Sequence, residues 1–169
     1  PPEQMPSVAI YHPAASKLFE SLTEYRKWYL ARNGESRRFR LDSDSTIGLL
    51  LMRPQVISKT TKHYEALIGA IEAEGLDVIP AIATLMDNRE AVSKFFIEQT
   101  KTKDQSPKTK SLVSQIVSLT GFSFVGGPAM NDSAAASEFL KQLNVPYRSA
   151  VSLDTQTIEA WKDSDIGLN

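Results

Sequence analysis

Residues 46–52, TIGLLLM, form an uninterrupted apolar run after a polar stretch. A run this short and continuous is typical of a central strand in a parallel sheet, because such a strand is covered on both faces. Residues 60–75, TTKHYEALIGAIEAEG, follow with apolar side chains at helical spacing. Thr60 or Thr61 is the expected N-cap of this helix and Gly75 its expected end. The order predicts a strand–helix unit.

The same alternation continues toward the end of the chain. Proline is rare inside central strands, so Pro80 is expected to end or bend the second strand. Asp154 is the expected cap of the last helix. Repeated strand–helix units predict an α/β fold, an open parallel sheet with helices on both faces, of Rossmann or flavodoxin type. The further strands are predicted at 76–83, 111–119 and 145–151, and the further helices at 88–99, 131–143 and 154–164.

The first 45 residues differ from this pattern. A short strand-like run, SVAIY (7–11), precedes an amphipathic stripe of Leu18, Leu22, Tyr25 and Tyr29. We therefore expect an N-terminal strand–helix segment with a polar connector over 1–45, and the α/β domain over 46–169. The chain opens on proline and is expected to be a piece of a longer one. The lysine-rich, apolar-free stretch 100–110 predicts a mobile loop.

Composition excludes several classes of function. Nineteen basic and 20 acidic residues give a net charge of -1, which favours neither nucleic acid nor an anionic membrane. No apolar run approaches the roughly 20 residues that span a bilayer. The absence of cysteine excludes disulfides, zinc thiolate sites, iron–sulfur clusters and cysteine nucleophiles, and it is compatible with a cytoplasmic protein.

A glycine-rich stretch follows the third strand of the predicted sheet. Ligands of open parallel sheets collect beyond the carboxyl ends of the strands, and glycine lets a backbone or ligand approach closely. Gly121, Gly126 and Gly127 therefore predict a shaped turn, with an apolar lip made by the neighbouring Phe122, Phe124 and Val125. The turn can equally serve only to reverse the chain. Its spacing fits neither G-x-G-x-x-G nor a Walker loop.

Other candidates lie near the same strand ends. Arg53 could bind a carboxylate bidentately or form a salt bridge with a neighbouring loop. His63 either contacts a ligand or partner or is simply exposed. His12 lies in a different region, so no paired-histidine metal site is expected, and no nucleophile–base set is visible. Turn or cap positions account for Asp87, Asp132 and Asp154.

Two long stretches resemble a known family. Residues 46–83 and 117–161 are similar to the large H subunit of magnesium chelatase, which is related to the large subunit of cobaltochelatase. The motifs SLTGF (118–122), VGGPA (125–129) and LNVPY (143–147), followed by QT-E-W, carry the resemblance in order. The opening 11–30 also resembles the segment that precedes this domain in the family.

The resemblance implies a role in chlorophyll or bacteriochlorophyll synthesis. In the family the large H subunit binds protoporphyrin IX. Two AAA+ partners, the I and D subunits, use ATP hydrolysis to drive the insertion of Mg2+, which is a ligase reaction. A GTHG-like segment associated with the active site in the family is absent from these residues, so we expect the chain alone to be inactive and to hold no cofactor or metal. The remainder of the large subunit is then a partner. The location is cytoplasmic, or the plastid stroma in a plant or alga.

The resemblance also implies which residues contact porphyrin or a partner. Where the family often has Arg-Ser-His, this chain has Arg53, Pro54 and Gln55, so only the arginine matches. Two alternatives stay open: a stand-alone small-molecule binding module of flavodoxin or periplasmic-binder type, and a non-catalytic spacer domain. The expected contacts are Arg53, His63, Tyr64, Thr120, Gly121, Phe122, Gly126, Gly127 and Pro128.

Overall fold

The computed structural model describes residues 5–32, 41–84, 87–101, 107–126, 131–150 and 156–166. Its centre is a five-stranded sheet in the order β1-β3-β2-β6-β7. Strands β2, β3, β6 and β7 are parallel, whereas β1 pairs antiparallel with β3. The predicted α/β fold with a parallel sheet is therefore confirmed. The strands are β1 (Ala9–Ile10), β2 (Thr46–Met52), β3 (Asp77–Ala83), β6 (Gln115–Ser118) and β7 (Tyr147–Ser149).

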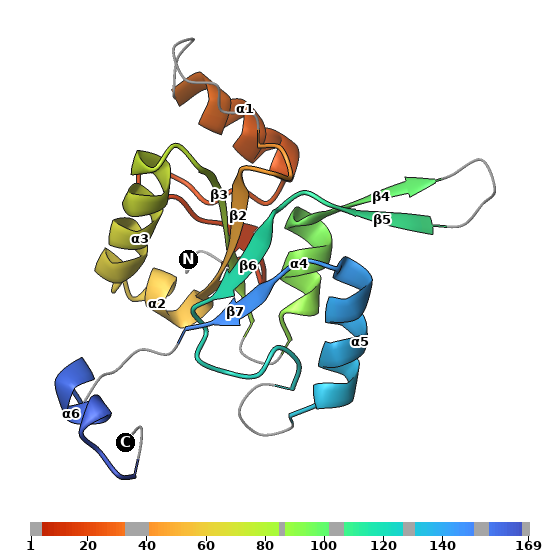
Figure 1. Ribbon diagram of the computed structural model, residues 1–169. Helices are drawn as coiled ribbons and strands as arrows, with labels where there is room; N and C mark the ends of the chain where they lie inside the picture. Colours follow the sequence, from red (N-terminus) through yellow and green to blue (C-terminus); the bar gives the residue numbers. More distant parts are fainter. Residues whose placement is uncertain are drawn as a thin grey trace.

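Helices lie on both faces of the sheet (Figure 1). Helices α2 (Arg53–Ile57) and α3 (Lys62–Ala73) follow β2 on one face, and α4 (Arg89–Phe95) and α5 (Ser133–Leu143) lie on the other. The chain first moves from β2 to β3 and then crosses back to β6. Right-handed crossovers in opposite directions place their helices on opposite faces.

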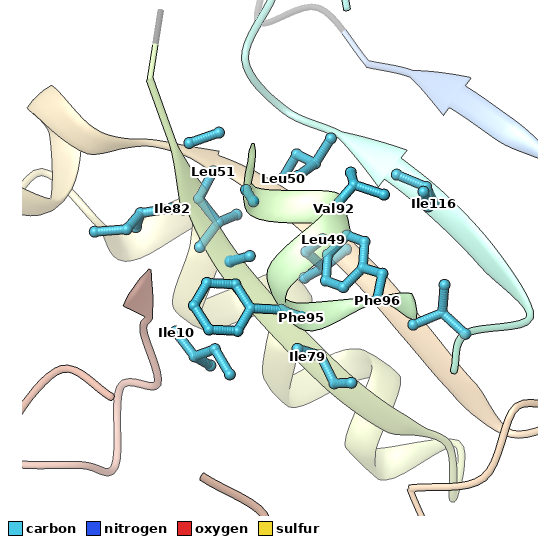
Figure 2. Close-up of a cluster of buried hydrophobic side chains, with 14 of the residues drawn as sticks. Ile10, Leu49, Leu50, Leu51, Ile79, Ile82, Val92, Phe95, Phe96 and Ile116 are labelled. Atoms are coloured by element: carbon cyan, nitrogen blue, oxygen red, sulfur yellow. The ribbon is translucent and has the colours of Figure 1, made fainter. Parts of the chain in front are cut away.

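The core fills the space between β2, β3 and α4 (Figure 2). Leu49, Leu50 and Leu51 are completely buried, as the continuous apolar run predicts for a central strand. A Cβ atom on Gly48 would lie 2.9 Å from Cε2 of the buried Phe96. Glycine at this position therefore lets the Phe96 ring pack directly on the β2 backbone.

The prediction of a loop over 100–110 is wrong for residues 100–101 and 107–110, which lie in strands, while its mobility stays a prediction. Strands β4 (Ile97–Lys101) and β5 (Pro107–Ser111) form an antiparallel ribbon that extends from the body in Figure 1. The ribbon escaped prediction because it carries almost no apolar alternation. Its register instead places Glu98 opposite Lys110, an opposite-charge pair that favours pairing across strands. The strand predicted at 111–119 is accordingly shorter, and only β6 joins the sheet.

Pro80 does not end its strand, since β3 continues to Ala83. The Pro80 carbonyl accepts a hydrogen bond from the Tyr11 amide at 2.8 Å, on the side of the sheet where β1 lies. The missing N–H of Pro80 faces the same side, because the N–H and C=O of one strand residue point the same way. Proline is tolerated there because β1 ends at Ile10, so no β1 carbonyl needs a hydrogen bond from an N–H at position 80.

Helix ends follow the predictions in part. Gly75 has a φ of +78° directly after α3, as expected of a helix stop. Thr61 occupies the N-cap position of α3, but its hydroxyl donates to Glu65 at 2.7 Å instead of capping the backbone. The cap of α6 (Ile158–Lys162) is Thr157, whose hydroxyl accepts from the Ala160 amide at 3.1 Å. Asp154, the predicted cap, lies outside the described residues.

Helix α1 (Leu22–Arg32) closes the end of the sheet at which β2 and β3 begin (Figure 1). Tyr25 and Tyr29 are completely buried with ring centroids 5.3 Å apart, and the Tyr25 hydroxyl donates to the Val78 carbonyl at 2.8 Å. The helix begins at Leu22, so Leu18 of the predicted stripe precedes it. We call this region, formed by α1, His12 and the start of β3, the closed end.

An ionic cluster around the buried Glu72 joins the closed end to α3. Both Nη atoms of Arg32 donate to the Glu72 carboxylate at 3.0 Å, and His12 Nε2 lies 3.2 Å from Glu72 Oε1. Burial tends to raise the pKa of Glu72, but hydrogen bonds with His12, Arg32 and Tyr29 outweigh it and lower this pKa to about 2. The N-terminal segment is thereby joined to the sheet by β1 and by this cluster.

Candidate functional site

The opposite end of the sheet, which we call the rim, carries the segments that follow the carboxyl ends of β2, β3, β6 and β7. Strand β2 leads to helices on one face and β6 leads to α5 on the other. Where two neighbouring strands are followed by helices on opposite faces of the sheet, a crevice opens between the strand ends. Ligands of open parallel sheets bind at this crevice. Leu50 pairs with Ser118, and Arg53 and Gly121 each lie three residues beyond them. Arg53 and Gly121 therefore both follow the carboxyl ends of adjacent strands.

The glycine turn after β6 has the geometry that glycine allows. Gly121 has a φ of +71° and Gly126 a φ of +93°, both in the left-handed region that disfavours other residues. A Cβ atom on Gly121 would meet no atom within 4 Å, so the space above this exposed backbone is open. Gly127 and Pro128, which the sequence also proposed as contacts, lie outside the described residues.

The predicted apolar lip is present only in part. Phe124 and Val125 are 4% and 5% exposed, so their side chains belong to the core. The Phe124 ring packs at 5.5 Å from the rings of both Phe139 and Tyr147. Phe122 is half-buried at the surface, in a segment that turns at Gly121 and Gly126 and does not follow the regular alternation of a strand. A flat ligand at the turn would meet Phe122 and bare backbone.

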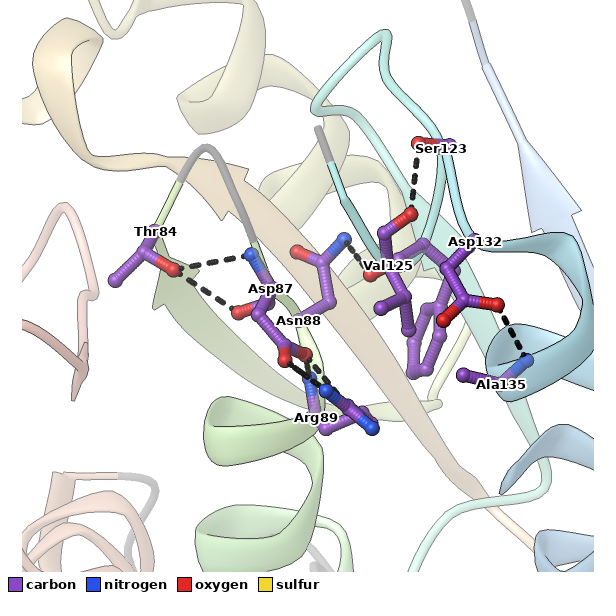
Figure 3. Close-up of polar contacts among 9 residues, drawn as sticks. Thr84, Asp87, Asn88, Arg89, Ser123, Val125, Asp132 and Ala135 are labelled. Atoms are coloured by element: carbon purple, nitrogen blue, oxygen red, sulfur yellow. Dashed lines mark hydrogen bonds and ion pairs between the residues drawn. The ribbon is translucent and has the colours of Figure 1, made fainter. Parts of the chain in front are cut away.

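Backbone hydrogen bonds join the loop after β3 to the loop after β6 (Figure 3). The backbone amide and the side-chain amide of Asn88 both donate to the Phe124 carbonyl at 3.1 Å, and Asp87 forms a β-bridge with Val125. The Thr84 hydroxyl donates to the Asp87 carbonyl at 3.0 Å. Sequence reasoning did not find this junction, because it depends on which loops the strand order brings together.

The aspartates at the rim act as turn and cap residues, as predicted. Asp87 accepts from the Arg89 backbone amide at 2.9 Å, and its carboxylate is also held by the Arg89 guanidinium, with the shortest contact 2.6 Å. Hydrogen bonds from the Arg89 side chain lower the pKa of Asp87. Asp132 accepts from the Ala135 amide at 2.9 Å at the start of α5.

Tyr64 and Thr120 are buried rather than exposed to a ligand. The Tyr64 hydroxyl accepts from the Met52 amide at 3.1 Å, so this side chain supports the end of β2, and burial raises its pKa. Thr120 is 3% exposed and its hydroxyl lies 3.0 Å from that of Ser118. His63 is exposed, with Nε2 3.0 Å from Gln55 Oε1.

Arg53 lines a pocket of about 590 Å³ between the ends of β2 and β3. Its Nε donates to the Pro6 carbonyl at 2.9 Å and its Nη2 to the Met5 carbonyl at 2.8 Å. Within the described ranges no carboxylate pairs with Arg53, so the expected salt bridge to a neighbouring loop is not seen. The other lining residues are Met5, Pro6, Ser7, Glu20, Pro54 and Thr84.

The described part of the chain contains no group of three or more histidine, cysteine, aspartate or glutamate side chains that could hold a metal ion. It also contains no helix long and apolar enough to cross a membrane. Among its described residues the rim presents the Arg53 guanidinium fixed by backbone carbonyls, the exposed His63, the half-buried Phe122 and the open backbone of Gly121.

Comparison with known proteins identifies the family. The CobN/magnesium chelatase family model matches residues 1–169. The chain is 35% identical over 161 residues to the chloroplastic ChlH subunit of magnesium chelatase from Oryza sativa subsp. indica, and the match covers 95% of this chain and 11% of that protein. It is 43% identical over 123 residues to the magnesium-chelatase H subunit of Cereibacter sphaeroides, covering 73% and 10%.

The magnesium-chelatase H subunit of Rhodobacter capsulatus is similar at 42% identity over 124 residues, which is 73% of this chain and 9% of that protein. The chain spans about a tenth of the length of these curated relatives. The match over all 169 residues agrees with the motifs that carried the resemblance. On this evidence the chain belongs to the CobN/magnesium chelatase family.

Proposed function

We propose that this chain is a domain of a magnesium-chelatase H-type subunit and that its rim forms part of the porphyrin-binding surface. The observation that carries the proposal is the family match over the whole chain, together with identities of 35–43% to subunits named for magnesium chelatase. The reaction is then ATP-dependent insertion of Mg2+ into protoporphyrin IX, in chlorophyll or bacteriochlorophyll synthesis.

The chemistry of the rim is compatible with a tetrapyrrole. This ligand is a flat apolar ring with carboxylates at one edge, so it needs close approach over a broad surface. Gly121 offers exposed backbone with open space above it, and Phe122 offers an aromatic side chain beside it. We propose Gly121, Phe122, Gly126 and His63 as direct contacts.

Other residues that the sequence proposed as contacts are Tyr64, Thr120, Gly127 and Pro128. Tyr64 and Thr120, both buried, hold the ends of β2 and β6 in place. Gly127 and Pro128 follow Gly126 in the sequence and are proposed as further contacts. We propose no metal insertion by this domain alone; the chelation step belongs to the rest of the large subunit, acting with the AAA+ type I and D subunits in the cytoplasm or plastid stroma.

A matched pair of glycine substitutions tests the proposal in the full-length subunit. Gly121 at the rim and Gly75 at the closed end share positive φ values, +71° and +78°, and each has no atom within 4 Å of an added Cβ. Asparagine tolerates this backbone conformation, as Asn144 with a φ of 52° shows in the same chain. Each substitution to asparagine therefore adds a side chain into open space with little strain.

Gly121→Asn is expected to lower protoporphyrin IX affinity and the rate of Mg2+ insertion several-fold, because the new side chain fills the space that the ring needs. Gly75→Asn is expected to leave both unchanged. Fluorescence titration with the porphyrin and a reconstituted chelatase assay measure the two effects. Equal affinities and rates for the two variants would remove the rim from the porphyrin site and favour the spacer alternative.

A further inference from the structure

The guanidinium of Arg53 is held along one edge by the protein backbone. Its Nε and Nη2 donate to the consecutive carbonyls of Pro6 and Met5, at 2.9 and 2.8 Å. Two parallel bonds from neighbouring nitrogens fix the plane of a guanidinium as well as its position. Arg53 therefore has a defined orientation in the absence of any ligand.

The strand order explains why backbone carbonyls reach Arg53. Strand β1 runs antiparallel to β3, with Ala9 opposite Ile82. The residues before Ala9 therefore continue past the carboxyl end of β3 and onto the rim. The Ser7 hydroxyl donates to Glu90 Oε1 at 3.4 Å, which ties the same segment to α4.

The charge of Arg53 remains uncompensated at this position. Carbonyl groups are neutral, and no carboxylate of the described residues forms an ion pair with Arg53. A guanidinium carries more N–H donors than these two bonds use. Arg53 is half-buried and lines the 590 Å³ pocket at the ends of β2 and β3, so its positive charge lies at a cavity large enough to admit part of a ligand.

We infer that Arg53 is a pre-oriented anchor for a carboxylate of the ligand that enters this pocket. Fixing the guanidinium in advance lowers the entropic cost of binding, and the planar fork of arginine matches the two oxygens of a carboxylate. Glu20 also lines the pocket and repels an anion that approaches from its side. The carboxylate is thereby directed to Arg53.

This inference rests on the proposed function, in which the ligand is a porphyrin and the carboxylate is a propionate at its edge. Neighbouring strands lie about 4.8 Å apart, so the ends of β3 and β6 are about 10 Å apart across β2. One flat ligand can therefore place its carboxylate at Arg53 and its ring over Gly121. The pocket and the glycine turn become two parts of one site.

The test compares protoporphyrin IX with its dimethyl ester in the full-length subunit. The ester keeps the apolar ring and loses both negative charges. The native subunit is expected to bind the acid about ten-fold more tightly than the ester, as one charge-assisted bidentate contact allows. Arg53→Gln is expected to abolish the preference for the acid and leave ester binding unchanged. Arg53→Lys is expected to retain part of the preference, because it keeps the positive charge and loses the bidentate geometry. Arg148→Gln on the exposed edge strand β7 is the control, with the preference retained.

A second substitution keeps the test decisive if Arg53→Gln disturbs the segment that it fixes. Glu20→Gln removes the competing negative charge and is expected to tighten acid binding about two- to three-fold without changing ester binding. Equal affinity for acid and ester in the native subunit, or a preference that survives Arg53→Gln, overturns the inference and leaves the proposed function standing. Absence of any porphyrin binding by the native subunit overturns both.

Discussion

The two ends of the sheet are built in opposite ways. At the closed end, α1 packs its tyrosines into the core, and the buried His12 and Glu72 form an ionic cluster with Arg32, whose side chain is 30% exposed. At the rim, loops are joined mainly through backbone groups, and Gly121 and His63 are exposed. The closed end therefore pairs its charged side chains around a buried carboxylate, while the rim presents open backbone and, at a pocket, the charge of Arg53, which no carboxylate of the described residues pairs.

Because of this difference, the closed end mainly contributes to the stability of the domain, and the rim is free to bind a ligand. Buried charges must find partners inside the protein, so those at the closed end are unavailable to a ligand. Backbone bonds such as Asn88 to Phe124 hold the rim loops without occupying the space above them. Substitutions at the closed end should therefore change stability, and substitutions at the rim should change binding.

The largest expected loss of stability comes from Glu72→Gln at the closed end. The substitution leaves Arg32 and the buried His12 without a carboxylate, and breaking a largely buried ion pair costs about 2 to 3 kcal/mol when one partner is a third exposed. Urea unfolding of the chain and of the variant at neutral pH measures the difference. A loss below about 0.5 kcal/mol, the usual scale of a surface change, would show that the cluster contributes little to stability.

The same carboxyl makes stability depend on acid pH. Its pKa is lowered from 4.5 to about 2, so the folded state favours the charged form. The contribution is fully present above pH 4.5 and is lost as the pH falls toward 2, which corresponds to about 3 kcal/mol. The difference in unfolding free energy between the native chain and Glu72→Gln should therefore become smaller as the pH falls from 4.5 toward 2. A difference that stays constant from pH 6 to pH 3 would contradict the assignment.

Tyr25→Phe is expected to have a smaller effect at the same end. It removes the buried hydroxyl that donates to the Val78 carbonyl and keeps the ring, which costs about 1 kcal/mol. Thermal unfolding is the measurement. Porphyrin affinity of the full-length subunit should not change, and a change would show that the closed end takes part in binding.

Gly121→Asn at the rim should have the smallest effect on stability, within about 0.5 kcal/mol, because asparagine accepts positive φ and meets no neighbouring atom. Gly121→Ala is the comparison, since alanine accepts this φ less readily and is expected to cost about 1 kcal/mol. Denaturant unfolding of the two variants checks the order. If asparagine were the more destabilising, the space above Gly121 would not be open.

The parts of the fold that depend on local pattern could be predicted from sequence. The apolar run 46–52 and the helical stripe after it gave a correct strand–helix unit, and Gly75 ended the helix as expected. The ribbon of β4 and β5 could not be predicted, because its sequence is polar and carries almost no apolar alternation. The prediction that Pro80 ends its strand is wrong, because a proline is tolerated in β3 only where the neighbouring two-residue strand β1 has ended.

The candidate site was predictable only in outline. Strand ends and glycines located the rim, but the partners of Arg53 lie 47 and 48 residues earlier in the chain and become neighbours through β1. The turn buries Phe124 and leaves Phe122 half-buried at the surface, which the glycine pattern alone could not decide. Long-range pairing, and not local propensity, determines both features.

Hydrogen–deuterium exchange of the full-length subunit with and without protoporphyrin IX tests the difference between the two ends most directly. We expect porphyrin to slow exchange in peptides that cover 53–57 and 119–126 at the rim. Peptides that cover α1 and the last turn of α3, residues 70–73 beside the closed end, should exchange at the same rate in both conditions. Protection confined to the closed end, or no change at the rim while porphyrin is bound, would contradict the placement of the ligand site.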